Sequence, residues 1–340
     1  MRLKPHGLFL ARDRDQCRHG GVCAARREGE GGRGEAPESG GGVPAVDGSP
    51  QVQFPALPAA QLSGDRRCFV ETARIRGYEA GPDRRATIQC IANLLQEVAS
   101  NHAISVWGKT DEGFAASPVM VEKNLIFVIS RLHIKINKYP SWGETARLET
   151  WFTLERRFIG RRAWSIQDAA TSETLGEATS WWVVINTKTR KMSRMPTEMI
   201  EQWWPYTLQD SSMYSMSGAA DVKKKIQDPE TMAQVRSGVI HVAGHSYMDM
   251  NGHINNVAYL EWALDALPQE VFQNYVLKET EVDFLGECSV GDRVETVLYR
   301  ADIQENGSSK APVFVHVLRK ADGIDKGQEI ARLRTSWLRV

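Results

Sequence analysis

The sequence predicts an α+β fold in which two similar units follow one another along the chain. The first observation is the order of its patterns, because a long segment with helical apolar spacing precedes several β-rich segments instead of alternating with them. The second observation is a weak internal repeat: Trp142–Thr150 and Val290–Thr296 share a Gly-acid turn followed by a Glu-Thr pair in a strand. With 340 residues, the chain is long enough for two domains, each with its own core.

The first 66 residues differ in composition from the rest of the chain. Gly, Arg, Pro, Ala and Glu dominate there, and no apolar periodicity is present. We therefore expect residues 1–66 to form a disordered leader. An Arg-rich leader is typical of organelle targeting, although the acidic residues of this one are unusual for a transit segment.

The first unit is predicted at residues 67–200 and contains the longest helical pattern of the chain. Ile88, Ile91, Leu95 and Val98 recur at steps of three and four, which places them on one face of a helix over residues 86–107. Segments rich in β-branched and aromatic residues, separated by turn signals, predict strands. These segments are 69–80, 124–136, 145–156, 161–170 and 177–187.

The second unit is predicted at residues 235–340, after a polar linker at 201–234. A short helical pattern at 195–204 overlaps the start of this linker. It repeats the order of the first unit, with a strand, a helix and then further strands. The predicted helix spans 255–267, before Pro268. The strand segments are 237–245, 279–300, 311–321 and 329–340.

A dense polar run lies directly before the second helix. Asp249, Asn251 and His253 alternate, so in an extended segment an acid, an amide and an imidazole share one face. Asn255 or Asn256 is suited to cap the helix, since its side chain accepts first-turn N–H groups. The polar run therefore sits at the positive end of a helix. There the amides near Asn256 and Val257 are placed to hold a developing oxyanion.

This run, DMNGHINNVAYLEWALDALP, resembles the active-site segment of plant and algal acyl-acyl-carrier-protein thioesterases of the A and B types. Seven residues fall on the pattern D-x-N-x-H-x-N-N-x-x-Y-x-x-W, namely Asp249, Asn251, His253, Asn255, Asn256, Tyr259 and Trp262. Glu287-Cys288 is similar to the Glu-Cys pair of that family, and the resemblance extends over about residues 68–340. It implies a tandem double hotdog fold, in which each curved antiparallel sheet wraps a long helix.

The resemblance also implies a reaction, a partner and a location. The reaction is hydrolysis of fatty acyl-acyl-carrier protein, which releases free fatty acid and ends chain elongation in the stroma of the plastid. It implies that Asp249, Asn251, His253 and Glu287 form the catalytic group. Other hotdog activities stay open: an acyl-CoA thioesterase, a 3-hydroxyacyl dehydratase and a non-catalytic acyl-binding protein.

Thioester hydrolysis needs an activated water or a nucleophile, and donors for the oxyanion. Our preferred assignment has Glu287 and His253 activating water, with Asp249 as either an electrostatic partner or a nucleophile. A Cys288-His253-Asn251 arrangement is the alternative with a cysteine nucleophile. A metal site is the third interpretation, from the spacing of four in His241, His245, Asp249 and His253, but Gly244 and Gly252 disfavour a helix there.

Substrate contacts are predicted mainly outside the polar run. We expect an acyl pocket in the first unit, which lacks such a run, lined by Ile91, Leu95, Val98 and Met120. The carrier protein is acidic, so basic clusters are candidates for docking it. These are Arg156, Arg157, Arg161, Arg162, Lys188, Arg190, Lys191 and Arg194.

Composition excludes other classes of function. Lys and Arg number 42 and Asp and Glu also 42, so the zero net charge does not indicate a nucleic-acid partner. No apolar run approaches the roughly 18 residues of a membrane span. Five irregularly spaced cysteines argue against a disulfide framework. We expect no metal and no cofactor, and the assembly is left open between a monomer and a homodimer.

Overall fold

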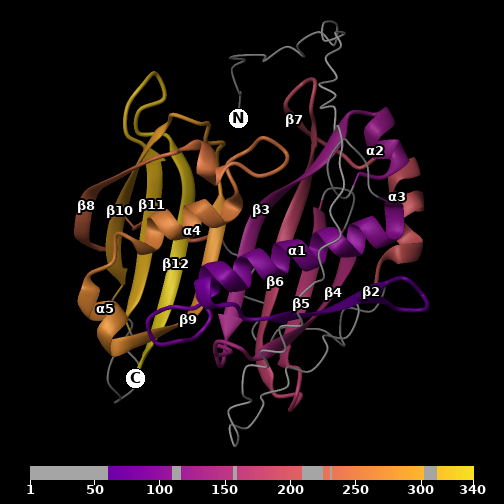
Figure 1. Cartoon of the computed structure of the whole chain (residues 1–340). Helices are drawn as coiled ribbons and strands as arrows, with labels where there is room; N and C mark the ends of the chain where they lie inside the picture. Colours follow the sequence, from indigo (N-terminus) through magenta and orange to yellow (C-terminus); the bar gives the residue numbers. More distant parts are fainter. Residues whose placement is uncertain (1–59, 109–115, 156–158, 209–224, 230–231, 302–311) are drawn as a thin grey trace, which may run out of the picture. The chain divides into compact units, whose positions relative to one another are not determined.

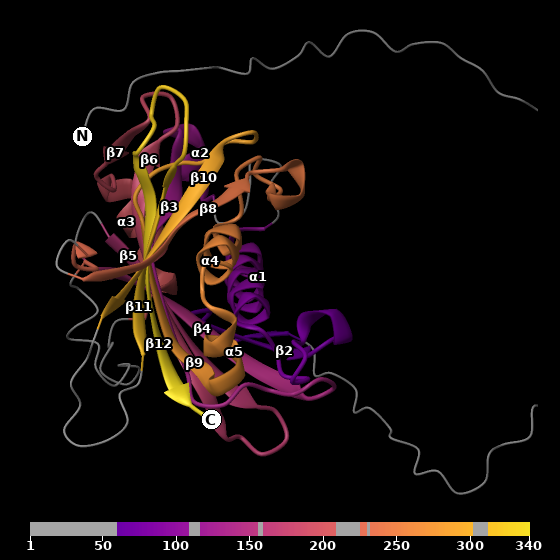
Figure 2. The same cartoon turned by 90° about the vertical axis from the view of Figure 1, so that its left-hand side faces the viewer.

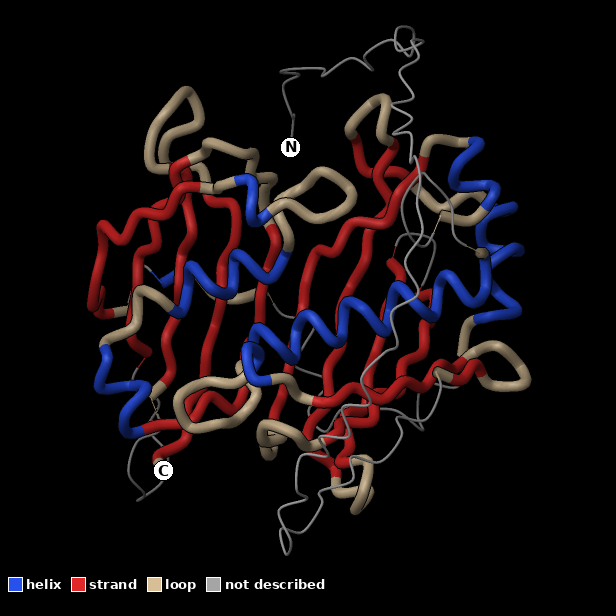
Figure 3. Tube along the Cα trace, in the orientation of Figure 1, coloured by secondary structure: helices blue, strands red, loops and turns tan. Residues whose placement is uncertain are grey.

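The described strands form one antiparallel sheet in the order β1-β2-β4-β5-β6-β3-β9-β12-β11-β10-β8, with β7 paired to β6. A computed structural model describes residues 60–108, 116–155, 159–208, 225–229, 232–301 and 312–340. Figure 1 shows the order of the strands, and Figure 3 separates strands from helices by colour.

The first half of the sheet is formed by residues up to Ser193. Its strands are β1 (Gln61–Leu62), β2 (Cys68–Arg74), β3 (Leu125–Ile136), β4 (Thr145–Glu155), β5 (Ile159–Asp168), β6 (Thr174–Asn186) and β7 (Lys191–Ser193). The predicted helix is α1 (Ile88–Trp107), which begins where the Thr87 hydroxyl accepts a hydrogen bond from the Cys90 amide at 3.1 Å. A short α2 (Pro118–Glu122) also occurs, which the sequence patterns did not predict.

The second half repeats this arrangement. Its strands are β8 (Ala233–Val242), β9 (Tyr275–Phe284), β10 (Arg293–Ala301), β11 (Val313–Lys320) and β12 (Glu329–Arg339). The helices are α4 (Asn256–Leu264) and α5 (Gln269–Asn274). The helix predicted at 255–267 is thus shorter than expected. After α4 ends, the amides of Ala266 and Leu267 donate to the carbonyls three residues earlier, which forms single tight turns and not a further α-helical turn.

The sheet order confirms the predicted repeat. Read outward from the centre, β3, β6, β5, β4 and β2 have their counterparts in β9, β12, β11, β10 and β8. The two halves join through antiparallel pairing of β3 and β9, in which Arg131 lies opposite Asp283 and Lys135 opposite Glu279. Such a tandem pair of helix-and-sheet units is the predicted double hotdog architecture.

Helices α1 and α4 pack on the same face of the sheet (Figure 2). Ile91, Leu95 and Val98 of α1 and Trp262 of α4 belong to one buried cluster that spans both halves. A second, smaller cluster surrounds Trp203 at the other end of α1. Burial of large aliphatic and aromatic side chains stabilises the fold by about 1.5–3 kcal/mol each.

Charged side chains occupy the opposite side of the central strand pair. Arg131 contacts Asp283 at 2.8 Å and also contacts Glu281, and His133 lies 2.6 Å from Glu279. Because β3 carries the bases and β9 the acids, this pairing favours the observed register over a shifted one.

The segment predicted as a linker begins with regular structure. Helix α3 (Thr197–Trp203) and a 3-10 turn (Trp204–Tyr206) extend past its expected start at residue 201. At the other terminus, the described end of the predicted leader contains β1, which pairs with β2. Most of that leader, residues 1–59, lies outside the described residues. Among the helices that are described, none is long and apolar enough to cross a membrane.

Two buried histidines predict a pH-dependent stability. Burial lowers the pKa of His102 to about 3, with the nearby Arg162 charge as a second cause, and burial lowers the pKa of His316 to about 4. Between pH 4 and 6.5 the unfolded chain therefore binds more protons than the folded one, and the free energy of unfolding falls as the pH falls. From pH 7 to pH 5 we expect a loss of about 2 kcal/mol for each histidine.

Urea unfolding at the two pH values checks this expectation. The His316→Gln variant provides the matched comparison, because the glutamine can keep a hydrogen bond to Thr335, which contacts His316 at 3.0 Å. The variant should lose about 2 kcal/mol less than the natural protein between pH 7 and pH 5. An unchanged pH dependence would contradict the assignment of a neutral buried His316.

Candidate active site

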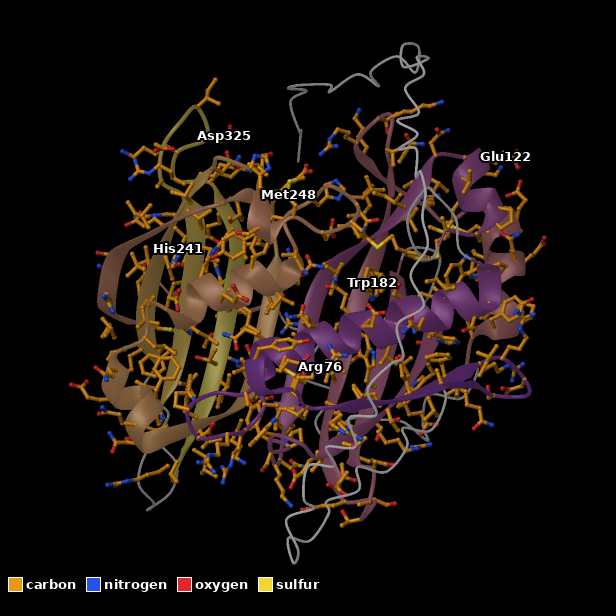
Figure 4. The ribbon with its side chains drawn as sticks, viewed as in Figure 1. Arg76, Glu122, Trp182, His241, Met248 and Asp325 are labelled. Atoms are coloured by element: carbon orange, nitrogen blue, oxygen red, sulfur yellow. The ribbon has the colours of Figure 1, made fainter. Side chains whose placement is uncertain are left out.

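The predicted polar run forms a tight loop beside the N-terminal end of α4. Met248 pairs with Ile254, the Asp249 amide donates to the His253 carbonyl at 2.8 Å, and Gly252 has a φ of +76°. That backbone conformation costs glycine little and other residues more. Met248, labelled in Figure 4, marks the start of this loop.

The Asp249 carboxylate holds the loop together. Its Oδ1 accepts hydrogen bonds from the amides of Asn251 at 2.8 Å and His253 at 3.1 Å, and its Oδ2 lies 3.4 Å from the Asn251 side-chain amide. A carboxylate that accepts two amide hydrogen bonds fixes the turn. The side chains of Asn251 and His253 are exposed.

Aromatic residues of the motif anchor the loop and the strand that faces it. Trp262 is fully buried, and the Tyr247 ring, at the start of the loop, packs edge-on against it at 5.3 Å between centroids. Tyr259 packs edge-on against Phe284, the last residue of β9, at 5.7 Å. These contacts place the end of β9 next to α4, and Glu287 follows three residues later.

Glu287 is the point where three distant segments meet. Its Oε1 lies 3.8 Å from Nε2 of His253, and its Oε2 contacts the guanidinium of Arg190, which comes from the turn between β6 and β7. His253 and Glu287 are about half exposed, at 52% and 50%. The amides of Leu285 and Gly286 both donate to the Ile330 carbonyl, at 2.9 and 3.0 Å, and fix the approach of this segment.

Arg190 was assigned to carrier docking from the sequence, and its place beside Glu287 was missed. The two residues are 97 positions apart in the chain. No local pattern relates them, because the first half is brought next to the second by tertiary contacts such as the pairing of β3 with β9.

The helix N-terminus is capped as predicted, which changes one oxyanion assignment. The Asn255 side chain accepts a hydrogen bond from the Val257 amide at 3.0 Å, so Asn255 and not Asn256 is the N-cap. The Val257 amide is therefore already occupied, and its proposed oxyanion role needs correction. Among the described residues, the Asn256 amide has no hydrogen-bond acceptor.

Cys288 faces the interior. It is 3% exposed, and burial raises the pKa of its thiol to about 12, with the Asp292 charge as a further cause. A thiol with so high a pKa supplies almost no thiolate at neutral pH, which is the form that attacks a carbonyl. Strand β9 ends at Phe284, so the alternation of a strand does not extend to Glu287 and Cys288. The two neighbours nevertheless differ, since Glu287 is exposed and Cys288 is buried.

The four residues of the metal alternative do not converge. His241 lies in β8 and stacks on Trp262 at 6.1 Å between centroids, whereas His253 faces Glu287. In the described ranges, three potential ligand atoms come within 4.8 Å of one another at His133, Glu279 and Glu281. There Glu281 is in contact with Arg131 and Arg334, whose charges oppose a cation.

The predicted pocket residues divide between two clusters. Ile91, Leu95 and Val98 are buried in the large core, and Met120 belongs to the smaller cluster around Trp203. The structure therefore does not bring all four together. A cavity with an empty volume of about 220 Å³, including solvent at its mouth, lies further along α1, at His102–Trp107.

The predicted docking residues also separate. Lys188, Arg190, Lys191 and Arg194 are exposed around β7, as docking requires. Arg161 is half-buried over the Trp181 ring, and Arg156 and Arg157 lie outside the described residues. Arg162 is 5% exposed, so its assignment to carrier docking is wrong.

Two helix-and-sheet units in tandem make this a double hotdog protein, and an acid and an imidazole lie beside its second helix. The profile described as "Acyl-ACP thioesterase N-terminal domain" matches residues 66–203, and "Acyl-ACP thioesterase C-terminal domain" matches residues 236–339. The chain belongs to the acyl-acyl-carrier-protein thioesterase family and is a thioester hydrolase.

Individual relatives agree with this family. The oleoyl-acyl carrier protein thioesterase 2, chloroplastic, of Arabidopsis thaliana is 35% identical over 299 residues, which cover 83% of this chain and 79% of that protein. A palmitoyl-acyl carrier protein thioesterase, chloroplastic, of the same plant is 34% identical over 276 residues, 80% of this chain and 64% of that protein. Among solved structures, the 12:0-ACP thioesterase from Umbellularia californica matches with a TM-score of 0.69 and 27% identity, covering 80% of this chain and 94% of that one.

Proposed function

We propose that this enzyme hydrolyses the thioester of fatty acyl-acyl-carrier protein in the plastid and releases free fatty acid and the carrier thiol. The observation that carries this proposal is the His253–Glu287 pair, 3.8 Å apart, beside the N-terminus of α4. The family, and relatives whose names specify acyl carrier protein and chloroplast, support the substrate and the location.

In the proposed mechanism, water is the nucleophile and the Glu287–His253 pair takes its proton. The water oxygen attacks the carbonyl carbon, and the carbonyl oxygen becomes an oxyanion. The Asn256 amide at the positive end of α4 and the Asn251 side-chain amide donate to this oxyanion. Collapse of the intermediate breaks the carbon–sulfur bond, and the proton taken from water passes to the departing thiolate.

We assign Asp249 the role of positioning residue. Its Oδ1 is engaged by two loop amides, and its Oδ2 faces the Asn251 amide, so the carboxylate holds the other two groups in place. An attack by Asp249 on the thioester would convert its carboxylate into a neutral anhydride, which accepts these hydrogen bonds less strongly. The geometry therefore favours the water route over an anhydride.

We further propose that the two halves divide the work, with residues 235–340 supplying the chemistry and residues 67–200 holding the acyl chain. The contact of Arg190 with Glu287 brings the first half to the reacting groups. The exposed bases Lys188 and Lys191 beside Arg190 form a positive turn next to the site. An acidic carrier docked on this turn would present its thioester to Glu287 and His253.

Assays with acyl-acyl-carrier protein and with acyl-CoA of the same chain test this function. We expect free thiol and free fatty acid from the carrier substrate, with higher kcat/KM than from acyl-CoA. An enoyl product would instead identify a dehydratase, and binding without any product an acyl-binding protein. Light scattering of the same sample distinguishes a monomer from a homodimer.

Charge reversal of the positive turn tests the docking surface. Lys188→Glu should raise KM for the carrier substrate roughly 3- to 10-fold at low salt, leave kcat nearly unchanged, and lose its effect as salt increases. Arg339→Glu is the matched control, because Arg339 is also exposed and is the last residue of β12. The C-terminus that follows it lies away from β7 in Figure 1. Equal effects of the two substitutions would contradict docking at this turn.

A further inference from the structure

Arg162 is a buried cation in the first half of the sheet that the proposed reaction does not use. It lies in β5 and is 5% exposed. Its Nη1 donates to His102 Nδ1 at 3.1 Å and to the Thr150 hydroxyl at 3.3 Å. Among the described residues, no carboxylate forms an ion pair with it.

The acceptors of this guanidinium are neutral. Because His102 Nδ1 accepts from Arg162, its proton is on Nε2, which lies 3.5 Å from the Arg66 carbonyl. Burial lowers the pKa of Arg162 to about 9, so the group is still charged at neutral pH. A buried charge without a counter-ion costs several kcal/mol, and an anion beside it would offset that cost.

The second half lacks this charge at the matching position. Phe152 pairs with Arg162 across β4 and β5, and in the repeat Leu298 pairs with His316 across β10 and β11. His316 is buried and bonded to Thr335. The shared sheet architecture therefore does not require an arginine at this place, and the charge is specific to the first half.

Arg162 borders the cavity at the C-terminal end of α1. The other walls are largely aromatic: Trp107 and Trp203 lie 5.3 Å apart between centroids, and the Tyr206 ring packs edge-on against Trp107 at 5.0 Å. The Arg162 guanidinium lies 5.4 Å from the Phe152 ring centroid. One end of a ligand here would meet a cation, and the rest would meet apolar rings.

The C-terminal end of α1 would repel a bound anion, but a second arginine, Arg66, offsets this repulsion. The last carbonyls of a helix carry partial negative charge. Arg66 donates to the carbonyls of Ser105 at 3.2 Å and Val106 at 3.0 Å, and its guanidinium lies over the Tyr206 ring at 5.1 Å. Two cations therefore border this end of α1.

We propose that this cavity binds the carboxylate end of a free fatty acid, with Arg162 as the anion partner and the aromatic walls around the first carbons. A planar carboxylate matches the fork of a guanidinium, whereas phosphate would turn oxygens without donors toward aromatic rings. The identification of this ligand as the released product rests on the proposed function. The existence of the binding site does not depend on that function.

Calorimetric titration with octanoate, 1-octanol and inorganic phosphate tests the site. Octanoate should bind the natural protein more tightly than octanol or phosphate do. Arg162→Gln should weaken octanoate binding by about 10-fold or more, as expected for loss of a charge-assisted hydrogen bond, and leave octanol unaffected. His253→Ala should bind octanoate like the natural protein, because the cavity is separate from the reacting groups.

Ala103→Leu provides a second variant, because Ala103 lines the cavity and a larger side chain fills it while Arg162 stays in place. It should also abolish octanoate binding, and it keeps the test valid if Arg162→Gln does not fold. Octanoate binding that is absent in the natural protein, lost in His253→Ala, or unchanged in Ala103→Leu overturns the proposal. Phosphate binding as tight as octanoate assigns the cavity to small inorganic anions instead. Because binding is measured without turnover, failure of the hydrolysis assay would not affect this result.

Discussion

His253→Ala and Glu287→Gln should each lower kcat for acyl-acyl-carrier protein by about 100-fold or more, which is typical for loss of a general base. Both side chains are about half exposed and lie 3.8 Å apart, so their replacement removes proton transfer without opening a cavity in the core. The Gln variant keeps the size of Glu287 and its contact with Arg190, but an amide does not take a proton from water. Steady-state kinetics with circular dichroism as a fold control measure the effect.

Cys288→Ala is the matched control for this pair. Its buried thiol, with a pKa raised to about 12 by burial, should not be the nucleophile, so the variant should keep most of the activity. An inactive Cys288→Ala variant together with an active Glu287→Gln variant would identify Cys288 as the nucleophile. A folded His253→Ala with near-normal turnover would reject the whole site.

Asp249→Ala should also reduce kcat strongly, by about 100-fold, whereas Asp249→Asn should stay within about 10-fold of the natural enzyme. The reason is that the asparagine carbonyl still accepts hydrogen bonds from the amides of Asn251 and His253, which the carboxylate now receives at 2.8 and 3.1 Å. Alanine removes both bonds and frees the loop.

The comparison of the two substitutions separates the roles that the sequence left open. A carboxylate nucleophile cannot be replaced by an amide, so an Asp249→Asn variant as inactive as Asp249→Ala would favour the anhydride route. Single-turnover measurements with acyl-acyl-carrier protein distinguish slow chemistry from slow product release.

Local sequence patterns predicted most elements of the fold because their causes are local. The spacing of Ile91, Leu95 and Val98 requires one buried helix face, and α1 is found there. The strands β3 to β6 lie where β-branched and aromatic residues gather. The short elements α2 and β7 and the early end of α4 were missed, because short segments depend on packing more than on their own pattern.

The candidate site divides in the same way. Asp249, Asn251 and His253 could be placed together from the sequence, since a loop before a helix is a local structure. The contact of Glu287 with Arg190 and the burial of Arg162 could not be predicted. The first depends on contact between the two halves of the chain, and the second on the packing of α1 against β5. Arginines of one cluster look alike in the sequence, and only their place in the sheet separates an exposed base from a buried one.

The sequence by itself determined the repeat of helix and strands, the capped polar run before the second helix and the family to which the chain belongs. These follow from periodicity and from motifs within single segments. The tertiary structure decided which acid faces His253, which basic residues reach the surface and where a cavity lies beside a buried charge. Such contacts join residues up to about a hundred positions apart, as Arg190 and Glu287 are at 97, and only the register of the assembled sheet fixes them.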